Sequence, residues 1–527
     1  MTSTTPAELL HLHPTDVEIE ENVRLDPRLN RDFLASIEEH GVLVPVLAVR
    51  TEGRGKPLVR EGQRRIQAAR QVGLSAVPVY VRTVDVTDTT AARAQRVIEQ
   101  MVTNDHRAPL TEAERARGIN QLLLEGVSPT KVARGLSTSK DAVSAAKVAI
   151  DSEKAMTALG SGQLSLVEAS RFVEFDGDDA AQSELIKVAG TDQFDHRVAQ
   201  LRSEREDQRR YEQTAAAFAA QGYAVLDRRP AWSDKTYIPT NYLRNTEGKT
   251  LTDEAIAAMD PQHWAVVLES AEAFVDTETG EPVDENDIDF DTADDPSAEP
   301  AEGLRHVRTV TETTVWSPDY YCRNPRGAGV VMPDWAARQY GFDADRLADA
   351  SDPDGAADRE RARLDEAEQE RAERRKLIAL NKLGDAAAVV RREWLRDNLL
   401  ARKTTPKGAG LYLADVIVNR PDLFSDYHGQ KLAPELLGLA DSETTQMAVA
   451  KLLPATGDGR AQVILLAMVL AATEARTAKD AWRGPQDITK TYLRFLEANG
   501  YALSDIEQVI VGMRDADAVY RRVCRED

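Results

Sequence analysis

The chain has very little cysteine and no long apolar run. Its two cysteines, Cys322 and Cys524, are too far apart to form a metal-ligand motif, and two thiols exclude a disulfide framework. This usage fits a reducing cytoplasm. No apolar stretch approaches the roughly 20 residues that cross a bilayer, and residues 1–16 lack the basic and apolar segments of a secretory signal. We therefore expect a cytoplasmic protein that does not enter a membrane.

Positive charge is also scarce. The sequence holds 66 Lys and Arg against 88 Asp and Glu, a net charge of -22, which argues against contacts with nucleic-acid phosphates. The excess is local, because residues 253–302 contain seventeen acidic residues and no Lys or Arg. Between Arg50 and Arg107, ten Arg and one Lys stand against six acidic residues. The sign of a local patch governs binding, so the overall acidity does not exclude a nucleic-acid partner.

The length of 527 residues is too great for one hydrophobic core and predicts an α+β multidomain protein. The expected parts are a disordered leader (1–16), a mixed α/β domain (17–110), a helical domain (111–205), a mixed β-containing region (206–340) with an acidic linker (276–303), a long charged helix (356–403) and a helical C-terminal domain (404–527). The acidic segment has too few apolar residues to fold alone. The long helix is either a dimerising coiled coil or a single exposed helix, because its leucines do not sustain a heptad.

The mixed α/β domain alternates helical and strand-like patterns. The predicted elements are helices over 32–40, 61–73 and 90–102, and strands over 42–49, 58–59 and 76–82. Gly41 is expected to end the first helix. Pro45 makes the first strand irregular or places it at a sheet edge.

The helical domain begins with clear start signals. Thr111-Glu-Ala-Glu114 has the form of a capping box, and Ser128-Pro129 has the cap-then-proline order of a helix start. After a short turn, a further helix is expected over 139–150. Val132, Val143 and Val148 are expected to be core residues of this helix pair.

A glycine and two arginines at a helix start form the first candidate site. Gly62 lets a ligand approach the backbone closely, and the free amides and helix dipole favour an anion there. Arg64 and Arg65 would add charge-assisted bonds to phosphate oxygens. Downstream, Asn104 offers an oxygen to a hard cation such as Mg²⁺, and Arg107 a further phosphate contact. The alternative is a solvated or salt-bridged surface turn, and no Walker motif is present.

The helix pair within 128–150 is the second candidate site, because its spacing is that of a helix-turn-helix. The second helix would enter the major groove of DNA with its first residues facing base edges. The residues placed at bases are Thr138, Ser139, Lys140, Ser144 and Lys147, and those placed at phosphates are Lys131 and Arg134. A purely structural helical hairpin is the alternative.

Several motifs, in order, resemble the ParB family of partition proteins over residues 17–205. LDPRLNRDFLASIEEHGVLVPVLAVR is similar to the family's N-terminal opening, and EGQRRIQAA to its arginine box. TNDHRAPLTEAERARGINQLLLEGVSPTKVARGLSTSKDAVSAAKVA is similar to its asparagine box and helix-turn-helix, and ALGSGQLSLVEASRFVEF to the helix pair that follows. The resemblance implies an N-terminal ParB/sulfiredoxin-like domain that binds CTP with Mg²⁺, a central helix-turn-helix domain and a mainly helical C-terminal half.

The same resemblance implies roles for single residues. The implied nucleotide site comprises Pro45, Gly62, Gln63, Arg64, Arg65, Thr103, Asn104 and Arg107, with Asn104 at the metal and Arg107 at a phosphate or the domain interface. The family has a glutamate where this chain has Gln63, an arginine at Gln67, and at Thr103 a glutamate linked to hydrolysis. Losing carboxylates near the phosphates removes candidates for activating water, so the chain is expected to bind CTP and to be at most a weak CTPase.

The implied function is that of a dimeric, CTP-gated clamp on double-stranded DNA with a centromere-like site, which partitions a plasmid, a phage or a chromosome. A ParA-type ATPase is a possible partner, although residues 1–21 contain no Lys or Arg to engage it. A helix-turn-helix transcriptional regulator on the same scaffold is the first alternative. A ParB-like nuclease is less favoured, because the sequence offers no obvious carboxylate cluster for two metals.

Overall fold

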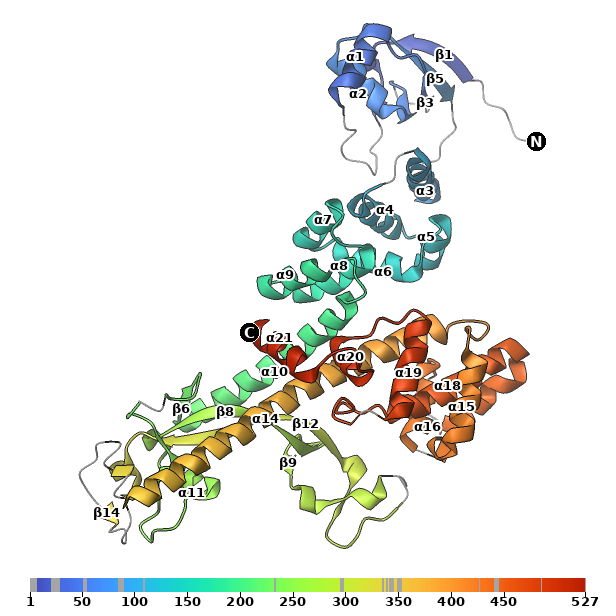
Figure 1. Ribbon diagram of the computed structural model, residues 1–527. Coiled ribbons are helices and arrows are strands. Elements are labelled where there is room, and N and C mark those ends of the chain that lie inside the picture. The colour runs from blue at the N-terminus through green and yellow to red at the C-terminus, as the bar shows by residue number, and fades with distance from the viewer. Residues whose placement is uncertain are drawn as a thin grey trace. The chain divides into compact units, whose positions relative to one another are not determined.

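The structure is a computed structural model that describes residues 7–19, 29–50, 55–83, 90–107, 110–231, 234–293, 298–333, 336–337, 340, 346–347, 353–425, 427–439, 445–484 and 486–526. The chain divides into two compact units, Met1–Phe194 and Asp195–Asp527 (Figure 1). Among the described residues, no helix is both long and apolar enough to cross a bilayer.

The first unit opens with a five-stranded mixed sheet in the order β1-β5-β3-β4-β2. Its strands are β1 (Ala7–Leu12), β2 (Glu18–Ile19), β3 (Val46–Arg50), β4 (Leu58–Glu61) and β5 (Val77–Thr83). β5 runs antiparallel to β1 and parallel to β3, and β4 runs antiparallel to β3 and parallel to β2. Val77, Val79 and Val81 of β5 are buried, so alternate residues of this central strand face the core.

Two helices supply the other half of this core. α1 (Arg31–His40) contributes Ile37, and α2 (Gln63–Gln71) contributes Ile66 together with two buried alanines. Asn30 caps α1 by accepting a hydrogen bond from the Phe33 amide at 3.1 Å. Gly41, with φ at 66°, ends α1 as expected.

The N-terminal leader departs from the sequence-based expectation of disorder over residues 1–16. Residues 7–12 form β1, which pairs along its whole length with β5. Residues 14–16 form the short helix η1 (Pro14–Asp16). Arg70 of α2 ties this segment down, because it donates hydrogen bonds to the carbonyls of Pro14 at 2.9 Å and Val17 at 2.7 Å. Residues 1–6 lie outside the described residues.

The remainder of the first unit is helical, as predicted. The helices are α3 (Thr90–Arg107), α4 (Glu112–Leu124), α5 (Pro129–Gly135), α6 (Lys140–Ala149), α7 (Glu153–Gly160), α8 (Leu166–Phe172) and α9 (Asp179–Val188). Both hydrogen bonds of the predicted capping box are present. The amide of Thr111 donates to the Glu114 carboxylate, and the amide of Glu114 donates to the Thr111 hydroxyl. Val132 and Val143 are fully buried, but the prediction that Val148 is core is wrong, because its side chain is 44% exposed. Its neighbours Ala146 and Ala149 take the inward face of α6 instead.

The second unit begins with the long helix α10 (Phe194–Gln221), which is continuous across residue 205, where the sequence suggested a boundary. A sheet of order β6-β8-β12-β7, with β9 on β8, follows. The strands of the unit are β6 (Ala224–Leu226), β7 (Ile238–Pro239), β8 (Trp264–Asp276), β9 (Pro282–Val283), β10 (Ile288–Asp289), β11 (Arg305–His306), β12 (Val310–Cys322), β13 (Met332–Pro333) and β14 (Arg346–Leu347). β8 and β12 pair antiparallel along their full length.

The acidic segment departs from the expected structureless linker. β10 pairs with β11, and Ile288, Thr292 and His306 are buried beneath these short elements. Asp276 and Asp289 each accept hydrogen bonds from backbone amides two residues further on. The aspartates therefore stabilise tight turns, the role in which short acidic side chains compete best with regular structure.

The described part of the second unit also contains the following helices after α10. They are α11 (Asp253–Ala257), α12 (Pro325–Ala328), α14 (Pro353–Trp394), α15 (Ala409–Asn419), α16 (Tyr427–Leu436), α17 (Thr445–Leu452), α18 (Asp458–Ala475), α19 (Asp487–Ala498), α20 (Asp505–Ile510) and α21 (Ala516–Glu526). α14 is the long charged helix expected over 356–403; it ends in the π-helical turn η8 (Leu395–Leu399). Its C-terminal half is not a free exposed helix, because Ala386 and Val390 enter the main core of this region.

Candidate functional site

The start of α2 requires a glycine. Gly62 has φ at 93°, in the left-handed region, and a Cβ atom there would lie 2.6 Å from Cγ1 of Val46. The first residue of β3 thus packs directly on the backbone that opens α2. No side chain caps this helix start. Within this turn the amide of Arg65 donates to the carbonyl of Gly62 at 2.9 Å, and the helix dipole favours an anion at the helix start.

The two arginines of this turn point to different partners. Nη1 of Arg65 donates to the carbonyls of Val44 and, at 3.1 Å, Pro45. Arg65 thus holds the loop before β3 against α2. The contact brings together Arg65 and Pro45, which the sequence analysis had placed in the nucleotide site from two separate segments. Cζ of Arg64 lies 4.1 Å from the centroid of the Phe33 ring on α1, a cation–π distance. Arg64 is exposed and Arg65 half-buried.

The structure describes only part of the remaining residues of the predicted nucleotide site. Gln63 is half-buried in the first turn of α2. Thr103, Asn104 and Arg107 fall in the last two turns of α3, but their side chains lie outside the described residues. Their contacts with nucleotide or Mg²⁺ stay predictions. Within the described part of the chain, no group of three or more His, Cys, Asp or Glu residues gathers as a metal site would require.

Gln67 and Arg70 of α2 complete the surroundings of this turn. Oε1 of Gln67 is buried and accepts no hydrogen bond from any residue the structure describes. Arg70, which fastens residues 14–17, was missed by the sequence reasoning. The sequence did carry one signal for a separate role of Arg70. Residues five apart on a helix lie on different faces, so Arg70 and Arg65 could not be expected to share their contacts.

The second candidate site is formed by α5, a four-residue turn and α6. Ser137 in the turn has φ at 52°, a conformation rarely adopted by residues other than glycine. The amide of Thr138 donates to the carbonyl of Ala133 at 2.9 Å. Ser139 caps α6 by accepting a hydrogen bond from the Ala142 amide at 3.0 Å. The turn therefore fixes where α6 starts.

The outer face of this helix pair carries four cations. Lys131, Arg134, Lys140 and Lys147 are all exposed, and none pairs with an acidic or polar side chain among the described residues. Ser139 and Ser144 are exposed on the same helix pair, and Thr138 is half-buried. The structure thus keeps every residue predicted to touch DNA at or near the surface. Exposed, unpaired cations on the same two helices as exposed hydroxyl groups suit a polyanion with hydrogen-bonding edges.

The first unit is therefore a small mixed-sheet domain with an anion-favouring helix start, followed by a helical bundle with a basic face. Residues 15–100 match the model of the ParB N-terminal domain. This part of the chain thus matches the N-terminal domain of the family whose motifs the sequence resembles.

Two curated relatives share this region. The chain is 37% identical over 113 residues to the chromosome-partitioning protein Spo0J of Thermus thermophilus, covering 21% of this chain and 39% of that protein. It is 35% identical over 104 residues to a probable plasmid-partitioning protein ParB of Xylella fastidiosa, covering 20% of this chain and 24% of that protein. The chain thus spans about two fifths or less of the length of these relatives.

Two solved structures are also similar. One is a truncated chromosome-partitioning protein ParB of Caulobacter crescentus complexed to the centromeric parS site, with a TM-score of 0.25, 20% identity, and coverage of 34% of this chain and 91% of that chain. The other is a truncated ParB of the same organism complexed with CTP-gamma-S, with a TM-score of 0.15, 21% identity, and coverage of 34% of this chain and 97% of that chain.

Proposed function

We propose that this protein is a ParB-type partition protein that binds a specific double-stranded DNA site and uses CTP to control how long it stays there. The observation that carries the proposal is the exposed, unpaired cation face of α5 and α6, which directly follows a ParB N-terminal domain. The whole-chain charge of -22 does not oppose this, because these cations have no acidic partner in the described structure.

The DNA contact uses α6 as the recognition helix of a helix-turn-helix. Residues of its first turns, Ser139, Lys140 and Ser144, face base edges in the major groove together with Thr138 and Lys147. Lys131 and Arg134 on α5 contact phosphates and fix the register. Val148, which is exposed rather than core, adds an apolar group near the same face; a thymine methyl is the base feature that such a group contacts.

The nucleotide contact uses the start of α2. Gly62 and Gln63 present backbone amides to the triphosphate, and Arg64 and Arg65 supply charge. Pro45, held by Arg65, borders the cytosine. Thr103, Asn104 and Arg107 on α3 complete the site, with Asn104 at Mg²⁺. A bound anion at α2 is supported by the helix dipole and by the close packing of Gly62 on Val46, which keeps a side chain out of the position before the first turn.

The proposal extends to assembly and cargo. Two copies form a dimer that closes around DNA, and the cargo is a plasmid, a phage genome or a chromosome in the cytoplasm. The names of the relatives, which include both chromosome-partitioning and plasmid-partitioning proteins, support this range. A ParA-type ATPase would move the cargo, and its contact lies outside the leader, which lacks basic residues.

The test is the salt dependence of DNA binding by the basic face. Fluorescence anisotropy with labelled, sheared duplex DNA would compare the full chain with the double variant Lys131→Ala, Arg134→Ala, which removes the two proposed phosphate contacts. Each lost phosphate contact should lower the slope of log affinity against log salt by about 0.9. Lys187→Ala, an exposed and unpaired lysine on α9, is the matched control and should leave the slope unchanged. An unaltered slope in the double variant would remove the proposed interface.

A further inference from the structure

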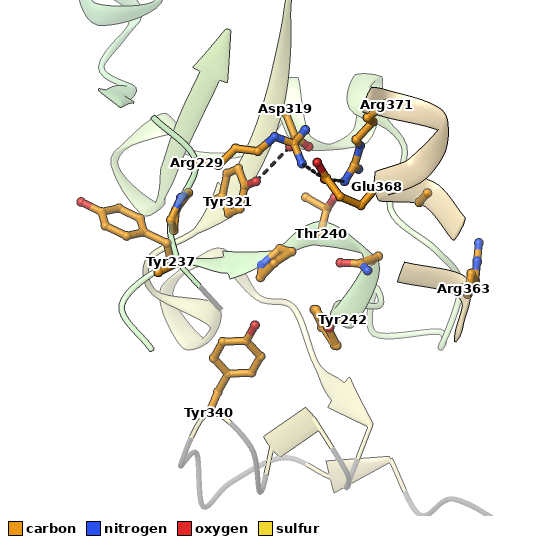
Figure 2. A pocket seen from close by; sticks show the side chains of 15 residues that line it. Arg229, Tyr237, Thr240, Tyr242, Asp319, Tyr321, Tyr340, Arg363, Glu368 and Arg371 are labelled. Carbon is orange, nitrogen blue, oxygen red and sulfur yellow. Dashed lines mark hydrogen bonds and ion pairs between the residues drawn. The ribbon is translucent and has the colours of Figure 1, made fainter. Parts of the chain in front are cut away.

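A cavity of about 730 Å³ lies in the second unit, remote in sequence from the ParB domain. Its walls come from residues 229–231 and 237–242, from β12, from Tyr340 and from the N-terminal half of α14 (Figure 2). The volume falls within the range of roughly 300–1,000 Å³ that small-molecule sites occupy. Nothing in the proposed partition function uses this space.

The interior of the cavity is aromatic. Tyr242 and Tyr340 are buried, and their rings meet edge to face with centroids 5.6 Å apart. Tyr237 and Tyr321 also line the space, and Figure 2 shows the labelled tyrosines around one hollow. Ring edges and faces arranged in this way favour a flat ring through offset or edge-to-face contact.

One wall holds a charge network that is complete within the protein. Arg229 pairs with Glu269 at 2.6 Å and with Asp319 at 2.9 Å, and it lies 3.7 Å from Glu368. The hydroxyl of Tyr321 donates to Asp319 at 3.0 Å. Glu368 also pairs with two arginines one and two turns further along α14, Arg371 and Arg375. Three arginines thus balance three carboxylates, and the network has no net charge to offer a ligand.

Arg363 is the one lining cation outside this network. It lies on α14 two turns before Arg371, lines the cavity and is exposed at its mouth. It forms no ion pair with any residue that the structure describes. Among the described lining residues, Arg363 is therefore the cation left to pair with a ligand, and it lies at the rim of the cavity.

Neutral polar groups between the rim and the rings are also available. The side chains of Thr240 and Asn241 form no hydrogen bond with the described residues. The hydroxyl of Tyr340 is protonated at neutral pH and can donate, and burial raises its pKa further, to about 12. A few convergent polar groups over an apolar interior are the usual composition of a small-molecule site.

We propose that this cavity binds a small molecule made of a flat aromatic ring and one anionic group, with the ring against Tyr242 and Tyr340 and the anion at Arg363. The anion is a carboxylate or a phosphate, since a guanidinium pairs with either. The site is separate from the proposed CTP site at α2, so the two can be tested independently.

Isothermal titration with matched pairs of probes tests this directly. Indole-3-acetate is compared with its neutral amide, and AMP with adenosine, all on the full chain carrying Arg64→Ala to silence the α2 site. We expect at least one anionic probe to bind about ten-fold more tightly than its neutral partner. In an added Arg363→Gln variant that preference should vanish, while Arg374→Gln, an exposed arginine on α14 that does not line the cavity, should keep it.

A cavity-filling variant separates this site from a surface contact. Ala367 lines the cavity from α14, and Ala367→Phe should abolish binding of the anionic probe without removing any charge. Preference for the indole pair alone identifies a carboxylate ligand, and preference for AMP alone identifies a phosphate ligand. Binding that survives Ala367→Phe, equal affinity for both members of each pair, or no binding of any probe would overturn the proposal.

Discussion

Gly62 shows how one residue sets the geometry of the proposed nucleotide site. An alanine there would occupy the left-handed region, at a cost of about 1–2 kcal/mol, and would press on Val46, at a further cost of about 1–3 kcal/mol. Gly62→Ala should therefore lower the stability of the first unit by about 2–5 kcal/mol. All six tryptophans lie after residue 195, so hydrogen exchange of peptides from β3 and α2 is the measurement.

Gly73 provides the matched control for this change. It has φ at 73°, but nothing lies within 4 Å of the position a Cβ would take. Gly73→Ala should cost only the backbone strain, about 1–2 kcal/mol. Equal loss of protection in the two variants would mean that the packing of Gly62 on Val46 has no energetic weight.

Residue types were easier to predict than their partners. The sequence identified Gly62, Arg64 and Arg65 from the chemistry of a helix start, and all three lie in the first turn of α2 or at its cap. It could not predict that Arg65 would hold the carbonyls of Val44 and Pro45, because that contact depends on how β3 and α2 pack. Val148 was misassigned for the same kind of reason: the small alanines of α6 fill the interior.

At the scale of elements, a buried ion network joins three helices of the C-terminal half. Arg391 of α14 donates to Glu474 of α18 at 2.9 Å and to Glu507 of α20 at 2.7 Å, and all three side chains are buried. Arg391→Met would leave buried Glu507 without a cation among the described residues and Glu474 with only Arg392, and we expect a loss of about 3–5 kcal/mol. Urea unfolding followed by tryptophan emission measures this.

Arg392 serves as the comparison, because it pairs with the same Glu474 at 3.1 Å but is half-exposed. Arg392→Met should cost under about 1 kcal/mol, as exposed pairs do. If both variants lose the same stability, burial is not what gives the Arg391 network its weight.

The same network predicts a dependence on alkaline pH. Burial raises the pKa of Tyr492 and of Tyr501 well above the ordinary value, and each hydroxyl donates to a buried glutamate. The folded state holds these protons more tightly than the unfolded state, so stability is complete below about pH 10 and falls as pH rises above it. The slope should be about 1.4 kcal/mol per pH unit for each tyrosine.

Replacing both hydroxyls isolates this effect from other tyrosines. In the double variant Tyr492→Phe, Tyr501→Phe, the unfolding free energy measured between pH 9 and 11 should fall less steeply than in the natural chain. Parallel slopes would show that these two groups do not titrate differently in the folded and unfolded states.

Elements with strong local signals were predicted well, and those that depend on distant partners were not. The capping box at Thr111 and the order Ser128-Pro129 start α4 and α5 where expected. β1 was missed because residues 7–12 form a strand only by pairing with β5, 65 or more residues away. The acidic segment was taken for a linker because its turns depend on aspartate–amide bonds, and composition does not reveal these.

At the scale of the whole molecule, nucleotide use should be separable from DNA binding. We expect CTP, but not ATP, GTP or UTP, to bind in the presence of Mg²⁺, and Arg64→Ala to abolish this binding. Gln63 and Thr103 stand where carboxylates would help activate water, so hydrolysis should be slow or undetectable. Phosphate release well above that of the Arg64→Ala variant would contradict the second expectation.

The central claim is that this chain recognises a specific DNA site and that CTP controls how long it stays bound there. The most direct test is to let the chain select fragments from sheared genomic DNA of the source organism. The immobilised full chain would be washed with and without CTP, and the retained fragments sequenced. The account predicts one short sequence strongly enriched, with CTP changing its retention, and loss of that enrichment in Lys140→Ala, Lys147→Ala but not in Lys187→Ala. Uniform recovery of all fragments, or enrichment that the α6 substitutions leave unchanged, would contradict it.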